Sequence, residues 1–339
     1  MPRLLLLVTG AREITLADGS PHETGFFAEE ALIPYERFAR AGLDIVVATP
    51  DGRPPYPDSY GLEEIFHYPD EDEDFLASIT RTFMPDADDI RLTLHHLTEL
   101  SMAAARQVFL ALRGAGLDPV AARDKVAAAA RIAWREDRNF ADVLTETGLA
   151  EPLTRAQVDE AVQRHKDESR QHSADVKARL DAIDGFAHPA SLAAMTAEEM
   201  AGFDAVFVPG GHGPMVDLSG SADVARLLRV LHEKNATIAA LCHGPAFLLS
   251  APDRDDGQWL FDGYRLTSFT DEEEVQTRVG KLGMPWFLEG ALKNAGAVFD
   301  DAAAAWTSHV VVDRNLVTGQ NPQSADAVAD AVLKHLEVL

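Results

Sequence analysis

The only cysteine of this 339-residue chain ends an apolar run, in the segment ATIAALCHGPAFLLS at residues 236–250. His243 follows Cys242 directly, and Gly244 and Pro245 come next. A strand that turns sharply into a helix here would lift the thiol clear of the sheet and point a helix N-terminus at it, which favours a thiolate. The same geometry serves the serine elbow of hydrolases. A lone cysteine is more often a small buried hydrophobe, but these flanks favour a nucleophile, with His243 suited to acid–base work.

A second candidate lies in the segment VPGGHGPM, where glycines end another apolar run. Exposed amides of Gly210 and Gly211 could form a nest that stabilises an oxyanion or binds substrate, next to His212. A plain turn is an equally good interpretation of this motif taken alone.

Other polar residues give weaker signals. Glu30 lies inside a predicted helix beside Glu29, and a solvated helix-face glutamate is the ordinary interpretation of both. His22, His212 and His309 are scattered without the spacing of metal ligands, so the sequence predicts no metal.

Alternating strand and helix patterns must position these residues. Leu4–Val8 is a continuous apolar run typical of a strand that is covered on both faces. A helical pattern over residues 26–41 and a second strand follow it, and the alternation resumes from about residue 200 to the end. This order predicts an open, mostly parallel sheet with helices on both faces, in which ligands lie at the carboxyl ends of the strands. The segments GGHG, CHG and TDEEE all fall at such predicted strand ends, the last as the acidic end of a strand over residues 264–274.

Between the two alternating parts, the chain is helical in pattern and rich in alanine from about residue 88 to 173. We predict one helix over residues 94–116, and a second with Asp118 as its cap and Pro119 in its first turn. A third has Thr154 and Gln157 at the spacing of a capping box. The domains predicted from these patterns are an α/β domain over residues 1–70 and 185–339 and a helical insertion over residues 71–184.

Composition excludes several classes of function. A formal net charge of −25 makes the chain a poor general binder of nucleic acid or anionic membrane. The apolar run near the N-terminus is too short to span a bilayer. A single cysteine rules out an internal disulfide framework and suits a reducing compartment, so we expect a cytoplasmic location.

Taken together, the segments LCHGPAFLL, VPGGHGPMVDL, TGFFAEEALIPYERFARAGLDIVVATPDG, SFTDEEE and HVVVDRNLVTGQNPQS resemble the PfpI-like superfamily of the class I glutamine-amidotransferase-like fold. Within it, the chain is most similar to the branch of the heat-shock chaperone and the glutathione-independent glyoxalase (glyoxalase III). The resemblance covers residues 1 to about 70 and about 185 to 339. It implies a flavodoxin-like α/β/α sandwich, commonly a homodimer, that needs no organic cofactor.

The resemblance also implies roles for single residues. The family's elbow cysteine and the histidine after it match Cys242 and His243, and its proton-sharing glutamate matches Glu30. Its third acidic member matches Glu274, although Glu272 and Glu273 are close enough to leave that choice open.

In the glyoxalase branch these residues imply conversion of a 2-oxoaldehyde such as methylglyoxal to a 2-hydroxy acid, through a hemithioacetal on the thiol. A glutathione-independent glyoxalase with hydro-lyase character is therefore the predicted enzyme, with a small reactive carbonyl as its partner. Protein deglycation, a chaperone that holds unfolded clients, and a cysteine peptidase or amidase are the alternatives.

The helical insertion departs from the family pattern. About sixty of its residues are similar to the carboxy-terminal helical domain of adenylosuccinate lyases, but they carry no catalytic motif. We expect this block to be a cap or an interaction module.

Overall fold

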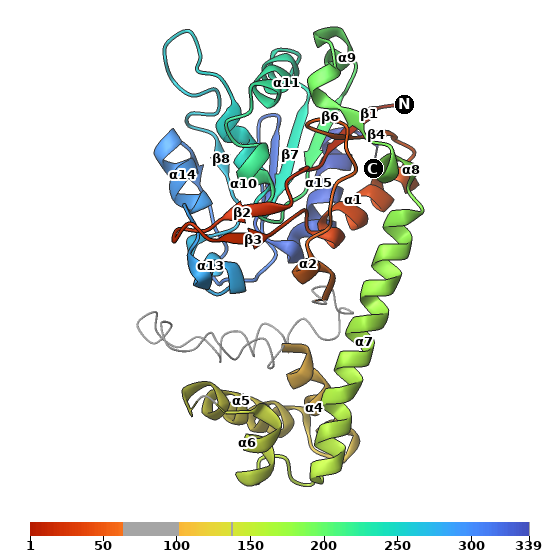
Figure 1. Ribbon diagram of the computed structural model, residues 1–339, viewed down its shortest axis with the longest axis vertical. Helices are drawn as coiled ribbons and strands as arrows, with labels where there is room; N and C mark the ends of the chain where they lie inside the picture. Colours follow the sequence, from red (N-terminus) through yellow and green to blue (C-terminus); the bar gives the residue numbers. More distant parts are fainter. Residues whose placement is uncertain (64–101, 137, 339) are drawn as a thin grey trace. The chain divides into compact units, whose positions relative to one another are not determined.

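The computed structural model describes residues 1–63, 102–136 and 138–338 (Figure 1). The chain divides into two compact units, one made of Met1–Leu62 with Asp175–Leu339 and the other of Glu63–Ala174. The division falls inside the helix α7 (Arg155–Asp181). We describe each unit by itself, and the domain boundaries drawn from the sequence stay a prediction.

The first unit is built on a seven-stranded sheet (Figure 1). Only the pair β10–β11 is antiparallel, so the prediction of a mostly parallel sheet is confirmed. In spatial order the strands are β10 (Val310–Asp313), β11 (Leu316–Gly319), β7 (Thr237–Leu241), β6 (Ala205–Val208), β1 (Arg3–Leu7), β4 (Asp44–Thr49) and β5 (Ala190–Ser191).

Continuous apolar runs form the central strands because both faces of the sheet are covered. In β1, Leu5 and Leu7 enter the core on one face, while Leu4, Leu6 and the following Val8 enter the core on the other. All five side chains are fully buried.

Helices cover both faces of this sheet, which makes a three-layer sandwich. The helices packed on one face are α1 (Ala28–Arg40), the end of α7, α8 (Asp184–Ala187) and α15 (Ala325–His335). Those on the other face are α9 (Ala197–Ala201), α10 (Pro214–Asp217), α11 (Ala222–Glu233), the 3₁₀ helix η4 (Gly244–Ser250) and α14 (Leu288–Ala295). Shorter elements are α2 (Ser59–Glu63), η3 (Leu192–Ala194), α12 (Asp271–Glu274), α13 (Arg278–Gly283) and η5 (Pro322–Ser324).

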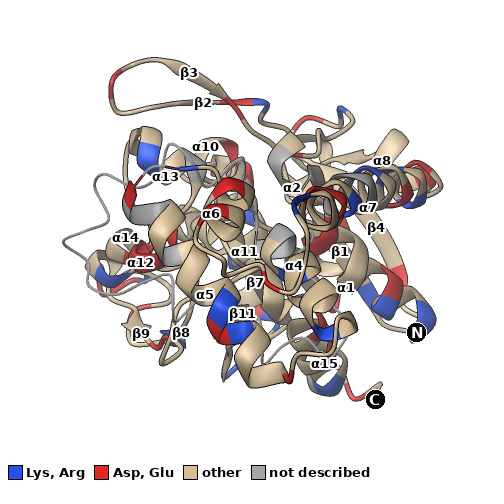
Figure 2. Cartoon of the chain, turned by 90° about the horizontal axis from the view of Figure 1, so that it is seen from below, with Lys and Arg blue, Asp and Glu red and all other residues tan. Residues whose placement is uncertain are grey.

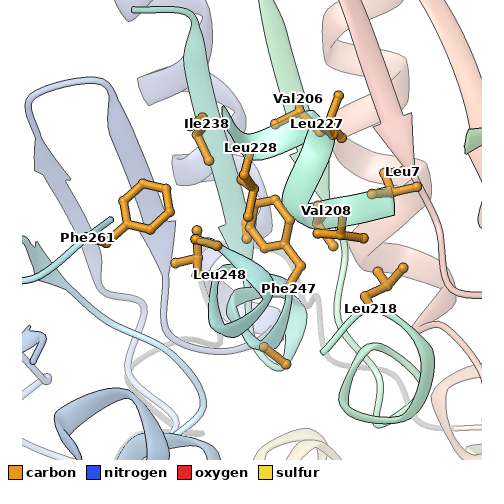
Figure 3. Close-up of a cluster of buried hydrophobic side chains, with 14 of the residues drawn as sticks. Leu7, Val206, Val208, Leu218, Leu227, Leu228, Ile238, Phe247, Leu248 and Phe261 are labelled. Carbon is orange, nitrogen blue, oxygen red and sulfur yellow. The ribbon is translucent and has the colours of Figure 1, made fainter. Parts of the chain in front are cut away.

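The short helix η4, which follows the cysteine, is anchored by its apolar side chains. Phe247 and Leu248 point into the cluster formed by Val206, Val208 and Leu228 (Figure 3). Burying a phenylalanine and a leucine contributes about 1.5–3 kcal/mol each. The backbone immediately after the thiol is therefore fixed by core packing.

Two small two-stranded sheets, one antiparallel and one parallel, were not predicted. One pairs β2 (Glu13–Thr15) with β3 (Pro21–Glu23) and extends away from the sandwich (Figure 2). The other pairs β8 (Arg265–Leu266) with β9 (Val298–Phe299).

The predicted strand over residues 264–274 is largely wrong. Only β8 is extended, and the acidic end of the segment forms the helix α12. A capping box causes this change, because Thr270 accepts from the amide of Glu273 while the Glu273 carboxylate accepts from the amide of Thr270. Carboxylates are also favoured in the first turn of a helix.

In the described part of the second unit, turns and loops connect four helices, which are α4 (Met102–Gly114), α5 (Pro119–Glu136), α6 (Phe140–Glu146) and most of α7. Asp118 caps α5, and Thr154 and Gln157 form the predicted capping box at the start of α7. The part of the predicted helix that lies before Met102 falls outside the described residues. Among the described helices, none is long and apolar enough to cross a membrane.

Candidate active site

Cys242 lies immediately after β7, at a sharp turn of the backbone. Its φ angle is +57°, in the left-handed region that residues other than glycine rarely adopt. The chain then enters η4, whose Gly244 has no room for a side chain, since a Cβ there would lie 2.3 Å from the carbonyl oxygen of Val208. Strain of this kind is kept where surrounding structure fixes it, as at a nucleophile elbow.

A hydrogen-bonded chain connects the thiol to a carboxylate. Cys242 Sγ lies 3.3 Å from His243 Nδ1, and His243 Nε2 lies 2.6 Å from Glu274 Oε2. All three side chains are buried. Because the Glu274 carboxylate is an acceptor, His243 donates from Nε2 and presents the lone pair of Nδ1 to the thiol. A neutral imidazole in this tautomer can accept the thiol proton.

Of the three consecutive glutamates in the acidic segment, Glu274 is the one that contacts His243. Glu273 points elsewhere and accepts hydrogen bonds from Gln320 Nε2 and Asn321 Nδ2, at 2.9 and 2.8 Å. Glu273 therefore ties α12 to the loop after β11, and Glu274 is the residue available for chemistry.

Glu30 approaches the same thiol from α1. Phe27, at the start of this helix, donates its amide to the carbonyl of Gly210, and Gly210 donates its own amide to Glu30 Oε2 at 2.7 Å. Oε1 of Glu30 has no well-formed hydrogen bond within the described residues. The carboxyl is fully buried beside Cys242, so one of its oxygens is free to exchange a proton there.

Burial favours the protonated forms of Glu30 and Cys242. Desolvation raises the pKa of Glu30 to about 8, and hydrogen bonds from Cys242 and Gly210 oppose that shift only in part. Burial, followed by the nearby Glu30 charge, also raises the pKa of the Cys242 thiol well above its ordinary value. The structure thus differs from the expected resting thiolate, because the backbone amides of Gly211 and His243 that face the sulfur do not offset its desolvation.

A second imidazole, that of His212, also contacts Glu274. The sequence analysis did not predict this contact. His212 Nε2 lies 2.9 Å from Glu274 Oε1, and the His212 and His243 rings are 4.2 Å apart between centroids. Burial alone would raise the pKa of Glu274, but the charge of His212 and the hydrogen bonds from His212 and His243 hold it well below its usual range.

The pKa values of the two imidazoles that contact Glu274 shift in opposite directions. Burial alone would lower the pKa of His212, but the charge of Glu274 and its hydrogen bond raise it. Burial, together with the charge of His212, lowers the pKa of His243 to about 4. His243 is therefore the neutral ring, as a base must be.

The predicted oxyanion nest is arranged differently from expectation. Gly210 does not offer a free amide, because its N–H is already donated to Glu30. The amide of Gly211 faces the Cys242 sulfur, and His212 turns its ring to Glu274. These three residues thus position the catalytic candidates, because the tight turn after β6 folds back onto α1 and α12.

Replacement of Gly210 by alanine is expected to distort the site more than the fold. A Cβ at this position would lie 2.6 Å from Glu30 Oε2 and 2.7 Å from Cys242 Cβ. We expect a stability loss of about 1–3 kcal/mol and a fall in turnover of about 10²-fold from misplaced groups. Thermal unfolding and steady-state kinetics measure the two effects. Gly114→Ala is the control, since a Cβ there meets nothing within 4 Å; equal losses in both variants would contradict the argument.

Two aromatic side chains pack next to the imidazole of His243, Phe269 directly and Trp306 behind it. Phe269 lies 4.5 Å from the His243 ring between centroids, and Trp306 lies 5.4 Å from Phe269. The backbone amide of Trp306 donates to the Glu273 carboxylate, so the capping glutamate also positions this aromatic pair. The sequence showed no signal for Trp306, because its contacts join segments that are distant along the chain.

The parallel sandwich and the strained cysteine beside a glutamate and an imidazole define a class: flavodoxin-like α/β proteins with a cysteine at a sharp turn after a central strand. The profile of the DJ-1/PfpI family matches residues 147–335, which is more than half of the chain. The chain belongs to the DJ-1/PfpI family.

Several known proteins are similar to part of the chain. Glutamine amidotransferase-like class 1 domain-containing protein 1 of Bos taurus is 37% identical over 142 residues, which are 42% of this chain and 62% of that protein. Glyoxalase 3 of Candida albicans is 30% identical over 138 residues, 40% of this chain and 58% of that protein. Protein/nucleic acid deglycase HchA of Escherichia coli is 34% identical over 150 residues, 42% of this chain and 50% of that protein. The chain thus spans only 50 to 62% of the length of these relatives.

A solved structure shows the same fold. The crystal structure of glyoxalase III from Candida albicans superposes with a TM-score of 0.51 at 19% identity, covering 98% of this chain and 96% of that one. The likeness to adenylosuccinate lyase in the helical unit stays a prediction.

Proposed function

We propose that this protein converts 2-oxoaldehydes such as methylglyoxal to 2-hydroxy acids, without glutathione and without an organic cofactor. One observation carries the proposal: the Cys242 thiol lies 3.3 Å from His243 Nδ1 and next to the buried carboxyl of Glu30. The names glyoxalase 3 and deglycase HchA of two relatives support the same substrate class.

The first step of the proposed mechanism is addition. As Cys242 Sγ bonds to the aldehyde carbon, His243 takes the thiol proton at Nδ1, and a proton passes to the carbonyl oxygen to give a hemithioacetal. The carbonyl of the substrate thereby becomes a hydroxyl, and no electrons are gained or lost overall.

The second step moves a proton between the two carbons. A base removes the hydrogen from the former aldehyde carbon to give an enediol, and an acid returns a proton to the neighbouring carbon. Glu30 and His243 both contact the Cys242 side chain and can alternate in these roles. The first carbon is oxidised to a thioester while the second is reduced to an alcohol, so no outside oxidant is needed.

Water completes the reaction. It adds to the thioester carbon, the C–S bond breaks, and the sulfur regains its proton from His243. Methylglyoxal plus water thus gives lactate. Glu274 holds the His243 ring in the required tautomer through all three steps, because its bond to Nε2 is short and buried.

The test is direct. The full chain, incubated with methylglyoxal and no thiol cofactor, is expected to form lactate in amounts equal to the methylglyoxal consumed. Lysine and arginine side chains scavenge aldehydes, and the chain has 30 of them, so consumption must exceed 30 molecules per chain to count as turnover. Loss of methylglyoxal that stops near this number, with no lactate, would contradict the proposal.

The deglycase name of the Escherichia coli relative favours a second candidate substrate, the adduct of a 2-oxoaldehyde with an amine or thiol. The Cys242 thiol would attack the former aldehyde carbon of the adduct, and the amine or thiol of the adduct would leave with a proton. Release of free amine faster than the spontaneous reversal of the adduct would distinguish this activity. The homodimer, the cytoplasmic location, the chaperone and the peptidase or amidase stay predictions.

A further inference from the structure

Three buried side chains of the site form a cluster with the composition of a metal centre. His212, His243 and Glu274 each offer one ligand atom, and these atoms all lie within 4.8 Å of one another. No local sequence pattern indicates this cluster, because Glu274 is separated by 62 residues from His212 and by 31 residues from His243. Two imidazoles and one carboxylate are ligands that Zn²⁺ prefers, with a fourth position left open in many sites.

The geometry of the cluster suits a small ion. His212 Nε2 and His243 Nε2 converge on one carboxylate, at 2.9 and 2.6 Å from its two oxygens. In a tetrahedral zinc site neighbouring ligand atoms are about 3.3–3.4 Å apart. Small outward shifts of the two rings would therefore admit an ion in place of the N–H protons that now lie between these atoms.

The ligands are also held from behind. The Thr277 hydroxyl donates to Glu274 Oε1 at 3.0 Å, and the helix that carries Glu274 begins with a capping box. His212 follows Gly211, whose φ of +83° fixes the turn after β6. Such supporting contacts orient ligands and strengthen metal binding.

We propose that His212, His243 and Glu274 form a binding site for Zn²⁺ or a similar divalent ion, and that a bound ion switches off the cysteine. The ion takes the lone pairs of both Nε2 atoms. His243 then keeps its one proton at Nδ1, and the surplus proton of the cluster goes to solvent. Nδ1 now faces Cys242 Sγ with an N–H instead of a lone pair, so the thiol loses the group that accepts its proton.

Binding is measured first, by equilibrium dialysis of the full chain against Zn²⁺. We expect about one tightly held ion per chain, in line with a three-ligand site, and a higher midpoint of thermal unfolding. His212→Asn and Glu274→Gln should each weaken Zn²⁺ binding at least about 10-fold, because substitution of residues that only support a ligand already weakens metal binding by that much. Cys242→Ser should bind as the unaltered chain does. His188→Asn is the control, because His188 pairs with Asp184 on the surface.

Co²⁺ provides a readout that needs no variant. A site of two imidazoles and one carboxylate should give visible d–d bands without the intense ultraviolet charge-transfer band of a thiolate ligand. That band, or loss of the tight ion in Cys242→Ser, would show that the sulfur is the ligand and overturn the assignment. Tight binding that survives in His212→Asn and Glu274→Gln, or no binding tighter than that of ordinary surface groups, would overturn it too.

Inhibition is measured second, as lactate formation with and without Zn²⁺ and after removal of the ion by a chelator. We expect a reversible loss. An ion that binds at these ligands and leaves turnover unchanged would contradict the switch but not the site. The binding measurements do not depend on turnover, so they stand or fall separately from the proposed glyoxalase activity.

Discussion

Cys242→Ser is expected to lower lactate formation from methylglyoxal by at least about 10³-fold, which is roughly 4 kcal/mol of transition-state stabilisation. Serine keeps the size and hydrogen-bonding position of the side chain, but its hydroxyl is a far weaker nucleophile at neutral pH. The lone pair of His243 Nδ1, 3.3 Å from the sulfur, assists a thiol well and a hydroxyl poorly in this buried setting.

The measurement is kcat/KM for methylglyoxal, with circular dichroism and thermal unfolding as controls for the fold. The chain has one cysteine, so no other thiol can substitute for it. Mass spectrometry of the unaltered chain after a short incubation should show a thioester or hemithioacetal on Cys242. Activity within tenfold of the unaltered protein in Cys242→Ser would mean that the sulfur does not form the bond that the mechanism requires.

Glu30→Gln is expected to reduce kcat by about 10²–10⁴-fold, the range that positioned acid–base groups contribute. With a pKa of about 8, Glu30 is largely protonated at neutral pH, so glutamine reproduces its shape and its neutral charge. An amide oxygen can still accept the hydrogen bond from Gly210, which is 2.7 Å long in the structure. What glutamine cannot do is release and regain a proton. Stability should therefore change little while turnover falls.

The matched control for that variant is Glu29→Gln, on the same turn of α1. Both glutamates are buried, but the Gly210 amide contacts Glu30. We expect kcat of Glu29→Gln to stay within a few-fold of the unaltered chain. Equal losses of kcat in both variants would assign the effect to the helix or its charge and not to proton transfer by Glu30.

Sequence patterns were sufficient for the central part of the fold. The runs in β1, β6 and β7 are buried on both faces, and burial on both faces leaves a continuous apolar stretch that is easy to recognise. The helix caps at Asp118 and Thr154 act within a few residues of themselves, so local sequence identified them. The hairpin β2–β3 and the one-pair sheet β8–β9 are three and two residues long per strand, too short for any periodicity to show.

The candidate site was predictable where it depends on local chemistry. The strand end and glycine around Cys242 indicated the elbow, and the choice among the three glutamates could also have been made locally. The pattern Thr270–x–x–Glu273 is a capping box, which commits Glu273 to the helix start and leaves Glu274 for His243.

The rest of the site depends on contacts across the fold. His212 reaches Glu274 only because the turn after β6 and the helix α12 meet in space. The protonation of Cys242 depends on how completely the sulfur is desolvated, and burial outweighs the amides that face it. Neither effect can be recognised from the residues that neighbour His212 or Cys242 in the sequence.

The left-handed backbone at Cys242 limits which atoms this protein family could use in place of sulfur. A threonine would bring a branched Cβ into a conformation where even an unbranched side chain is crowded, so of the hydroxyl nucleophiles only serine fits without rebuilding the turn. New reactions on this scaffold should therefore arise by substitutions of the side chains around the site, such as Phe269 and Trp306, while the cysteine stays the same.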